Sequence, residues 1–371
     1  MKILFLQLWY DLYGGIETVN DTLATQFNKD GYDTAILCLW SKGNGEYVET
    51  NTYEKKVIDN EPKRASYKQM INDICHFKFQ NIPSDIKKSF KYYKNKKSNY
   101  NVYSKKINEI NPDFIIVSNL ELLPLVPKEL LNKTIVHLHT STSFYAENKK
   151  FADIIKKYNN KVKKIVWLSS NFEKESKKMG FTNGTFINNP VRIKCSEIND
   201  LQNKTISFIG RFAEPKRPEL LVKMFNESKL ENEDWHLKIY GTGDSSNIET
   251  NENIHLMGGT DNVKKALLNS SVFALTSWYE GFPMVILEAY ECGVPVIIFD
   301  YGVSSSELVK DGKTGFIVPL DNEQIYIEKL KYLCDNYKMR EEMGKHAKEF
   351  VKNFYPENIS KKWYQLFRGE L

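Results

Sequence analysis

The chain has 371 residues, of which 41% are hydrophobic and 27% are charged, and it carries a formal net charge of +5. This composition is typical of a globular protein and excludes collagen-like, disordered and disulfide-stapled classes. Domains usually run to roughly 100–200 residues, so we expect two domains with a cleft between them. The five cysteines are far apart and form no Cys-x-x-Cys pair, which favours a reducing compartment over a disulfide framework or a thiolate zinc site.

The N-terminus predicts a buried strand and not a signal peptide. Residues 3–9 are mostly apolar, no small-residue cleavage site follows, and the chain leads straight into Gly14 and Gly15. No window approaches the ~18–20 apolar residues of a membrane helix. We therefore expect a cytoplasmic protein.

Charge is distributed unevenly along the chain. Residues 1–190 hold 29 Lys and Arg against 20 Asp and Glu, whereas residues 191–371 hold 23 against 27. Residues 86–108 combine five aromatics, among them Tyr103, with eight lysines and no carboxylate. This stretch fits an anionic membrane surface, and it fits a solvated helical face as well. No zinc-finger spacing or RNA-binding aromatic signature accompanies it, so we expect no nucleic-acid partner. The lysines are Lys87, Lys88, Lys91, Lys94, Lys96, Lys97, Lys105 and Lys106.

Short apolar runs alternate with amphipathic stretches. Continuous apolar runs between helices indicate buried parallel strands, which predicts an α/β protein with helices on both sheet faces. The runs form two series, at 3–9, 34–39, 114–117, 135–138 and 165–168, and at 206–209, 237–240, 272–275 and 294–299. Each series resembles a nucleotide-binding half, whose ligands lie outside the carboxyl ends of the strands.

The two series define the expected domains. We predict one Rossmann-like domain in residues 1–190, a polar linker in 191–204 and a second Rossmann-like domain in 205–350. Apolar residues between Ile359 and Phe367 recur at helical spacing. We expect this last helix, within residues 351–371, to pack back on the first domain.

The densest chemical signal follows the apolar run 272–275. Glu280 stands in a predicted loop, and Glu288 lies eight residues on in a predicted helix. Gly281 allows a close turn against a ligand, and a proline two residues later suits the first helical position. Carboxylates suit sugar hydroxyls, although an acidic helix start with a surface glutamate is the simpler interpretation. The first helical amides would be available to an anion such as phosphate; they belong to Met284 and Val285.

Two cations follow the first strand of the second series. Arg211 comes directly after Gly210, and Lys216 stands five residues further along. Fixed cations at the carboxyl end of a buried strand suit a diphosphate, although a solvated surface position is the commoner place for a single lysine.

Together these segments resemble the retaining glycosyltransferases of family 4, which have the two-Rossmann-domain architecture called GT-B. The resemblance covers nearly the whole chain. The family's Glu-x7-Glu element matches Glu280 to Glu288, and its Gly-Arg-x4-Lys element matches Gly210 to Lys216. Further matches are the glycine loop Gly14-Gly15-Ile16-Glu17, the histidine His139 and the segment Gly293-Val294-Pro295-Val296.

The resemblance implies a role for each matched residue. Residues 1–190 become the acceptor-side domain and residues 205–350 the nucleotide-sugar domain. The diphosphate would be held by Arg211 and Lys216, the donor sugar would be contacted by Glu280, and the ribose would be bound by Glu288. The implied catalytic residues are thus His139, Arg211, Lys216 and Glu280. The implied donor-binding residues are Gly14, Gly15, Gly210, Gly258, Gly259, Gly281, Phe282, Met284, Val285 and Glu288.

Some positions depart from the family or allow another interpretation. Pro283 stands where the family often has Gly, and serines precede Glu307 where the family has Gly-Gly. Both departures concern the sugar pocket. His139, two residues after His137, is alternatively a core residue or half of a metal pair, although no third ligand has suitable spacing.

The resemblance implies a retaining, metal-independent transfer of a hexose or N-acetylhexosamine. The donor would be a UDP-sugar and the acceptor a glycan or lipid-linked glycan in bacterial surface polysaccharide synthesis. No Asp-x-Asp pair occurs, so cations and a helix start would balance the leaving phosphate, with no metal or cofactor.

Four other classes of protein compete with this function. A dinucleotide dehydrogenase is suggested by residues 241–243, which match only part of the dinucleotide-binding motif. A phosphate-loop ATPase is suggested by residues 312–314, but the upstream glycine of that motif is missing. A nucleotide-sugar epimerase shares the two-domain architecture and would convert the donor without an acceptor. A non-catalytic module would bind the nucleotide sugar without turnover.

Overall fold

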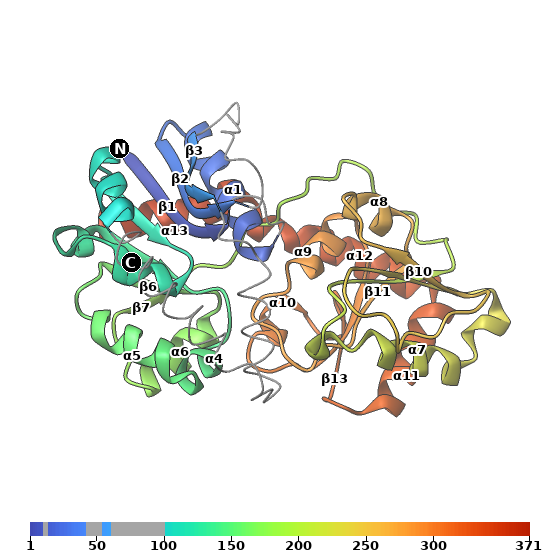
Figure 1. Ribbon diagram of the computed structural model, residues 1–371. Coiled ribbons are helices and arrows are strands. Elements are labelled where there is room, and N and C mark those ends of the chain that lie inside the picture. Colours follow the sequence, from blue (N-terminus) through green and yellow to red (C-terminus); the bar gives the residue numbers. More distant parts are fainter. Residues whose placement is uncertain (10–13, 42–53, 61–100) are drawn as a thin grey trace. The chain divides into compact units, whose positions relative to one another are not determined.

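The computed structural model of this chain describes residues 1–9, 14–41, 54–60 and 101–371. Its strands form two sheets (Figure 1), in the orders β3-β2-β1-β4-β5-β6-β7 and β10-β9-β8-β11-β12-β13. In each sheet the first strand of the series is central and the order runs outward from it in both directions, which is the doubly wound arrangement of Rossmann folds. The predicted α/β class with two Rossmann-like halves is confirmed.

The strands of the first sheet lie where short apolar runs predicted them, with two additions at its edges. The sheet comprises β1 (Lys2–Trp9), β2 (Asp33–Ser41), β3 (Glu54–Asn60), β4 (Phe114–Val117), β5 (Thr134–His137), β6 (Lys164–Trp167) and β7 (Gly184–Phe186). The side chains of Ile3 to Leu6 are fully buried, which explains the continuous apolar run. The labelled helices along this part of the chain are α1 (Gly15–Lys29), α4 (Thr142–Glu147), α5 (Lys149–Tyr158) and α6 (Ser170–Lys178), and residues 101–110 are helical as well.

The second sheet comprises β8 (Thr205–Ile209), β9 (His236–Tyr240), β10 (Ile254–Gly258), β11 (Val272–Leu275), β12 (Val296–Phe299) and β13 (Gly315–Val318). All of its neighbouring strands pair in parallel. Its helices are α7 (Pro218–Ser228), α8 (Val263–Leu268), α9 (Met284–Glu291), α10 (Ser305–Leu308), α11 (Glu323–Asp335), α12 (Tyr337–Phe350) and α13 (Pro356–Arg368).

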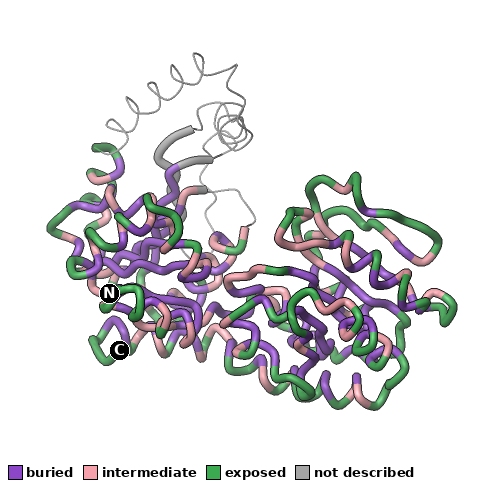
Figure 2. The backbone as a smooth tube through the Cα atoms, turned by 90° about the horizontal axis from the view of Figure 1, so that it is seen from below, coloured by how far each residue is buried: buried purple, intermediate pink, exposed green. Residues whose placement is uncertain are grey.

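Helices cover both faces of the second sheet. Helices α7 and α11 contact each other and the strands on one face, whereas α8, α9 and α12 contact one another in series on the other. In Figure 2 the chain is coloured by residue burial, with buried segments gathered in the interior and exposed residues along the outer turns. Short 3-10 turns complete the described part of the chain, at Leu120–Leu125, Lys128–Lys133, Glu214–Lys216, Leu230–Glu233 and Val351–Phe354.

The described chain divides into two compact units. One comprises residues 1–138, 145–166 and 179–185, and the other comprises residues 139–144, 167–178 and 186–371. The second unit therefore includes His139 and the final helix α13, on which Trp363 is fully buried. The predicted helix at the C-terminus is confirmed, and its packing on the first domain stays a prediction.

The lysine-rich stretch lies mostly outside the described residues, which include only Lys105 and Lys106 of its eight lysines. One aromatic of the stretch, Tyr103, is described, and its side chain does not lie on the surface. Tyr103 is fully buried, and its hydroxyl donates a hydrogen bond to the carbonyl oxygen of Leu37 at 3.3 Å. Within the described ranges, no helix has the length and apolar character needed to cross a bilayer.

A buried ion pair holds α9 in place. Glu291 is fully buried; its Oε1 forms an ion pair with the Lys348 Nζ at 2.9 Å and accepts a hydrogen bond from the amide of Cys195 at 2.8 Å. The Lys348 Nζ also donates to the carbonyl oxygens of Cys195 and Glu291, at 2.6 and 2.5 Å. One lysine of α12 therefore ties α9 to the chain segment that precedes the second sheet.

Candidate functional site

Lys216 and Glu280 meet at the point where the strand order of the second sheet reverses. Strands β8 and β11 are neighbours, and the chain leaves them toward opposite edges of the sheet. Ligands of doubly wound sheets bind outside the carboxyl ends of the strands at such a switch point. Lys216 follows β8 and Glu280 follows β11, and the Lys216 Nζ donates a hydrogen bond to the Glu280 Oε1. The structure thus brings two predicted site residues together where the fold predicts a ligand.

Main-chain hydrogen bonds hold the two loops against each other. The Thr276 hydroxyl contacts the carbonyl oxygens of Lys216 and Arg217, at 3.0 and 2.8 Å. The amide of Trp278 donates to the carbonyl oxygen of Pro215 at 3.1 Å, and the Arg217 Nε donates to the carbonyl oxygen of Thr276 at 3.0 Å. The Lys216 and Glu280 side chains therefore extend from a fixed frame.

The Lys216–Glu280 pair is largely shielded from water. The side chain of Glu280 is 9% exposed and that of Lys216 is 24% exposed. The Ser277 hydroxyl also donates to the Glu280 Oε1, at 2.6 Å. A charge-assisted pair in such surroundings is strong. An anionic ligand bound at the same place can replace Glu280 as the ion-pair partner of Lys216.

Arg211 is exposed and makes no hydrogen bond or ion pair with the described part of the chain. Its loop is nevertheless anchored, because the amides of Gly210 and Phe212 donate to the carbonyl oxygens of Tyr240 and Thr242, at 3.0 and 2.9 Å. The structure therefore does not bring Arg211 into contact with Lys216 or Glu280.

Close chain packing explains the partial dinucleotide motif at residues 241–243. A Cβ atom at Gly241 would lie 1.9 Å from the carbonyl oxygen of Gly210, and one at Gly243 would lie 2.4 Å from that of Phe212. Both glycines are thus required by the neighbouring loop after β8, whatever ligand binds there. Gly258 ends β10 with φ +71°, and its carbonyl oxygen accepts from the amide of Gly241 at 2.8 Å, while Gly259 follows it.

Helix α9 begins one residue later than predicted. Pro283 is the N-cap rather than the first helical residue, and its carbonyl oxygen accepts from the amide of Ile286 at 3.1 Å. Within the described residues the amides of Met284 and Val285 make no hydrogen bond. These two donors remain available at the positive end of the helix dipole. The ring of Phe282 packs 6.1 Å from that of Phe354, so this side chain belongs to the core.

Glu288, the second glutamate of the motif, is bound by an arginine that sequence analysis missed. Its side chain is 5% exposed, and its Oε1 accepts from the Arg192 Nε at 2.5 Å. Burial raises the pKa of Glu288, and the charge of Arg192 opposes that rise. Its assignment to a ribose stays a prediction. The only sequence signal for Arg192 is a single cation between the apolar residues Val191 and Ile193.

The segment that starts at His139 packs on the Glu280 loop. A Cβ atom at Gly281 would lie 2.9 Å from both the carbonyl oxygen of His139 and the Cα of Thr140, so only glycine fits. The Tyr279 hydroxyl makes hydrogen bonds to the hydroxyls of Thr140, at 2.9 Å, and Ser141, at 2.5 Å. The structure therefore places His139 next to Gly281 of the predicted site.

The His139 imidazole is desolvated, which lowers its pKa to about 3. The side chain is consequently neutral at physiological pH. A neutral imidazole can accept and donate hydrogen bonds to sugar hydroxyls without adding charge.

This neutral histidine predicts acid lability. The unfolded chain binds a proton at His139 near the ordinary histidine pKa of 6.5, whereas the folded chain binds it only near pH 3. The free energy of unfolding should therefore fall as pH drops from about 6.5 toward 3, and this loss is absent above that range. We expect His139→Gln to lose less stability than the wild type between neutral pH and about pH 5 in urea titrations. Equal losses in the two proteins would contradict a neutral, desolvated imidazole.

Glu307 caps a helix. Its carboxylate accepts hydrogen bonds from the amides of Ser170 and Asn171, at 3.2 and 2.9 Å, and from the Ser170 hydroxyl at 2.8 Å. A carboxylate at the start of α6 is favoured by the helix dipole. Upstream of Glu307, the Ser304 hydroxyl donates to the carbonyl oxygen of Gly281 at 3.1 Å, which links this loop to the candidate site.

Gly14 and Gly15 open α1 in the first compact unit. Gly14 is the N-cap of this helix, and a Cβ atom there would lie 2.4 Å from the Glu17 Oε2, whereas Gly15 has open space around it. Their predicted approach to the donor stays a prediction.

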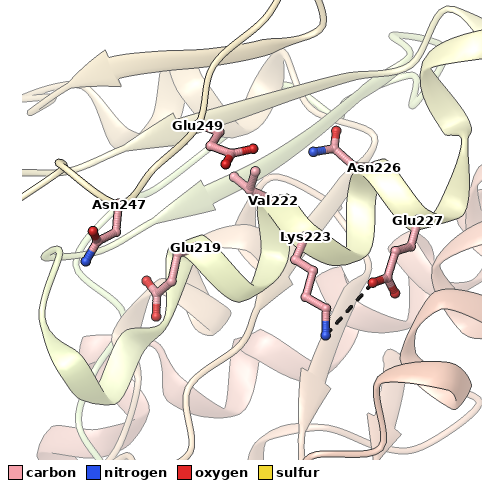
Figure 3. A pocket seen from close by; sticks show the side chains of 7 residues that line it. All are labelled: Glu219, Val222, Lys223, Asn226, Glu227, Asn247 and Glu249. Atoms are coloured by element: carbon pink, nitrogen blue, oxygen red, sulfur yellow. Dashed lines mark ion pairs between the residues drawn. The ribbon is translucent and has the colours of Figure 1, made fainter.

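A surface depression elsewhere is not a donor site. Figure 3 shows this depression of about 350 Å³ along α7, where Lys223 pairs with Glu227 at 3.9 Å. No predicted site residue lines it, and its three glutamates would repel a diphosphate. Its lining residues are Glu219, Val222, Lys223, Asn226, Glu227, Asn247 and Glu249. The described residues also contain no group of three or more His, Cys, Asp and Glu that could hold a metal ion.

Comparison with protein families identifies the second half of the chain. Residues 193–350 match the family model described as glycosyl transferases group 1. An uncharacterized glycosyltransferase of Haemophilus influenzae is 23% identical over 364 residues, which cover 94% of this chain and 95% of that protein. A poly(ribitol-phosphate) alpha-N-acetylglucosaminyltransferase of Staphylococcus aureus is 27% identical over 194 residues, which cover 49% of this chain and 39% of that enzyme. The match to the S. aureus enzyme thus spans less than half of its length.

Solved structures share the fold at low sequence identity. A structure of a S. aureus TarM mutant in complex with Fondaparinux, alpha-GlcNAc-glycerol and UDP superposes with a TM-score of 0.76 at 16% identity, covering 99% of this chain and all of that one. Anabaena Alr3699/HepE in complex with UDP gives a TM-score of 0.73 at 14% identity, with both chains fully covered. Together with the strand orders, these matches show the GT-B fold. Residues 193–350 therefore form a glycosyl transferase group 1 domain, and the chain is a glycosyltransferase of the GT-B fold.

Proposed function

We propose that this glycosyltransferase moves a hexose or N-acetylhexosamine from a UDP-sugar to a glycan or lipid-linked glycan in bacterial surface polysaccharide synthesis. The observation that carries the proposal is the Lys216–Glu280 pair at the switch point between β8 and β11. The S. aureus relative, named for N-acetylglucosaminyl transfer to poly(ribitol-phosphate), supports this acceptor class. The TarM and HepE structures, which hold UDP, support the donor class.

In the proposed reaction the departing diphosphate develops negative charge. Lys216 turns from Glu280 to the diphosphate, Arg211 approaches it from the same loop, and the free amides of Met284 and Val285 add partial positive charge. No divalent ion is then needed. Glu280, released by Lys216, accepts hydrogen bonds from hydroxyls of the donor sugar, because a carboxylate can accept two in one plane.

Attack on the anomeric carbon in the proposed reaction comes from the face that the diphosphate leaves. This geometry retains the anomeric configuration, as in the family-4 enzymes that the sequence resembles. The neutral imidazole of His139 approaches the sugar as a hydrogen-bond partner, and its low pKa prevents it from competing with Lys216 for the phosphate charge.

A panel of nucleotide sugars tests this function. We expect one UDP-sugar to raise the thermal midpoint, since a ligand at 100 times its Kd adds about 2.7 kcal/mol of stability. With a glycan acceptor, that donor should give a product of retained configuration in buffer with EDTA. Restoration of activity only by Mg²⁺ or Mn²⁺ would contradict the metal-free mechanism. Conversion of the donor without an acceptor would indicate an epimerase, and binding without turnover would indicate a binding module.

A further inference from the structure

Tyr301 has a buried hydroxyl that the free protein does not use. The residue follows β12, the neighbour of β11, so it lies at the same carboxyl edge of the sheet as Glu280. It is 7% exposed, and its hydroxyl has no hydrogen-bond partner among the described residues. Because a buried polar group without a partner destabilises the native state, such groups are rare and their retention points to a use.

The loop that carries Tyr301 is joined to the loop that carries Glu280. The Ser304 hydroxyl donates to the carbonyl oxygen of Gly281 at 3.1 Å, and the Ser305 hydroxyl donates to the Asp300 Oδ1 at 2.5 Å. Burial raises the pKa of Tyr301 well above its ordinary value, and among the charges that raise it further, that of Glu280 acts most strongly. The phenol and the Glu280 carboxylate are therefore electrostatic neighbours in one frame.

Glu280 loses a partner in the proposed reaction. In the free protein its Oε1 accepts from Lys216 and from Ser277. When Lys216 turns to the diphosphate, a carboxylate that is only 9% exposed keeps one hydroxyl donor. A buried carboxylate with so few donors is costly, and it would be poorly oriented toward the sugar.

We propose that Tyr301 is a positioning residue whose hydroxyl donates a hydrogen bond to Glu280 when Lys216 leaves it. The inference rests on the proposed function for the assignment of Lys216 to the diphosphate. The step is an exchange of hydrogen-bond partners at one carboxylate and requires no change of ionisation. Tyr301 thereby lowers the cost of opening the ion pair and keeps Glu280 oriented in the donor-bound state.

A double-mutant cycle on the free protein tests this exchange without any ligand. Lys216→Met removes the cation, so Tyr301 should then donate to Glu280. We expect Tyr301→Phe alone to leave the unfolding equilibrium constant unchanged or lower it, because it deletes an unpartnered hydroxyl. In the Lys216→Met background the same change should raise that constant about tenfold or more, as expected for a hydrogen bond to a charged group. Both constants come from urea titrations.

Tyr326 supplies the matched control. Its side chain is fully buried, but its hydroxyl already donates a hydrogen bond to the carbonyl oxygen of Ile297 at 3.1 Å. We expect Tyr326→Phe to raise the unfolding constant about fivefold, by the same amount with Lys216 or Met at position 216. If Tyr301→Phe behaves like this control, or if its effect is the same in both backgrounds, the exchange does not occur.

Binding of UDP extends the test to the ligand state. We expect Tyr301→Phe to weaken UDP binding about 3- to 10-fold in calorimetric titrations, with Tyr326→Phe unchanged. Equal UDP affinity in the wild type and Tyr301→Phe would overturn the proposal for the bound state. If the wild type binds neither UDP nor any UDP-sugar, the proposed function fails, and the outcome of the mutant cycle still decides whether Tyr301 can replace Lys216.

Discussion

Lys216→Met should lower kcat by about 100- to 1000-fold, which is the usual effect of removing one group that stabilises transition-state charge. The proposed mechanism places this lysine on the departing diphosphate, where its charge matters most as the bond to the sugar breaks. The side chain is partly buried beside Glu280, and methionine keeps its length and most of its apolar contacts. Steady-state kinetics with the donor found in the nucleotide-sugar panel would measure the effect.

Lys223→Met is the control for this substitution. Lys223 also pairs with a carboxylate, that of Glu323 at 2.6 Å, but it lies on α7 with a side chain that is 55% exposed. Its replacement should leave kcat within about twofold, because exposed ion pairs contribute little. Arg211→Ala should match the loss in Lys216→Met without lowering stability, since Arg211 is exposed and has no partner among the described residues. Near-normal turnover in Lys216→Met or Arg211→Ala would show that the diphosphate is not bound there.

Lys348→Met should destabilise the protein by about 3–5 kcal/mol, the cost of leaving a buried charge unpaired. Glu291 is fully buried, and Lys348 is the cation that pairs with it at 2.9 Å. The same lysine bonds two carbonyl oxygens that join α9 to the segment around Cys195. Helix α9 carries the free amides of Met284 and Val285 and the second glutamate, Glu288, of the candidate site. The affinity for the donor should therefore be lower in Lys348→Met as well. Urea titrations and UDP binding would measure the two effects.

Two further variants separate the buried charge from general effects on α12. Adding Glu291→Gln to Lys348→Met should recover part of the lost stability, because the pair is then replaced by neutral groups. Lys345→Met removes an exposed lysine of the same helix, paired with Glu341 at 3.0 Å, and should cost less than about 1 kcal/mol. A loss in Lys348→Met no larger than that in Lys345→Met would mean that Glu291 is not held by this pair.

The sequence predicted the inner strands well because each is buried on both faces. Strands β4 and β11 have the predicted bounds, β1 and β8 begin one residue earlier than predicted, and β5 is shifted by one residue toward the N-terminus. Burial on both faces requires a continuous apolar run, which is visible without any tertiary information. The start of α9 was displaced by one residue, since helix ends depend on local hydrogen bonds.

The strands without a predicted apolar run are those at the edges of the two sheets. They are β3 and β7 in the first sheet and β10 and β13 in the second. Strand β10 has three exposed residues, and β7 has only three residues in all. An edge strand needs a neighbour on one side only, so the sequences of β3, β7 and β10 carry little apolar signal.

By itself, the sequence determined the α/β class, the two strand series and the residue types that suit a nucleotide sugar, because local spacing encodes burial and chemistry. Only the tertiary structure decided which side chains meet. Lys216 pairs with Glu280 because β8 and β11 are neighbours, although 64 residues separate the two side chains. Arg192 holds Glu288, and the Tyr301 hydroxyl is left without a partner in the described chain, for the same reason. Contacts between residues far apart in the sequence depend on how the sheet is assembled, and no local pattern records that order.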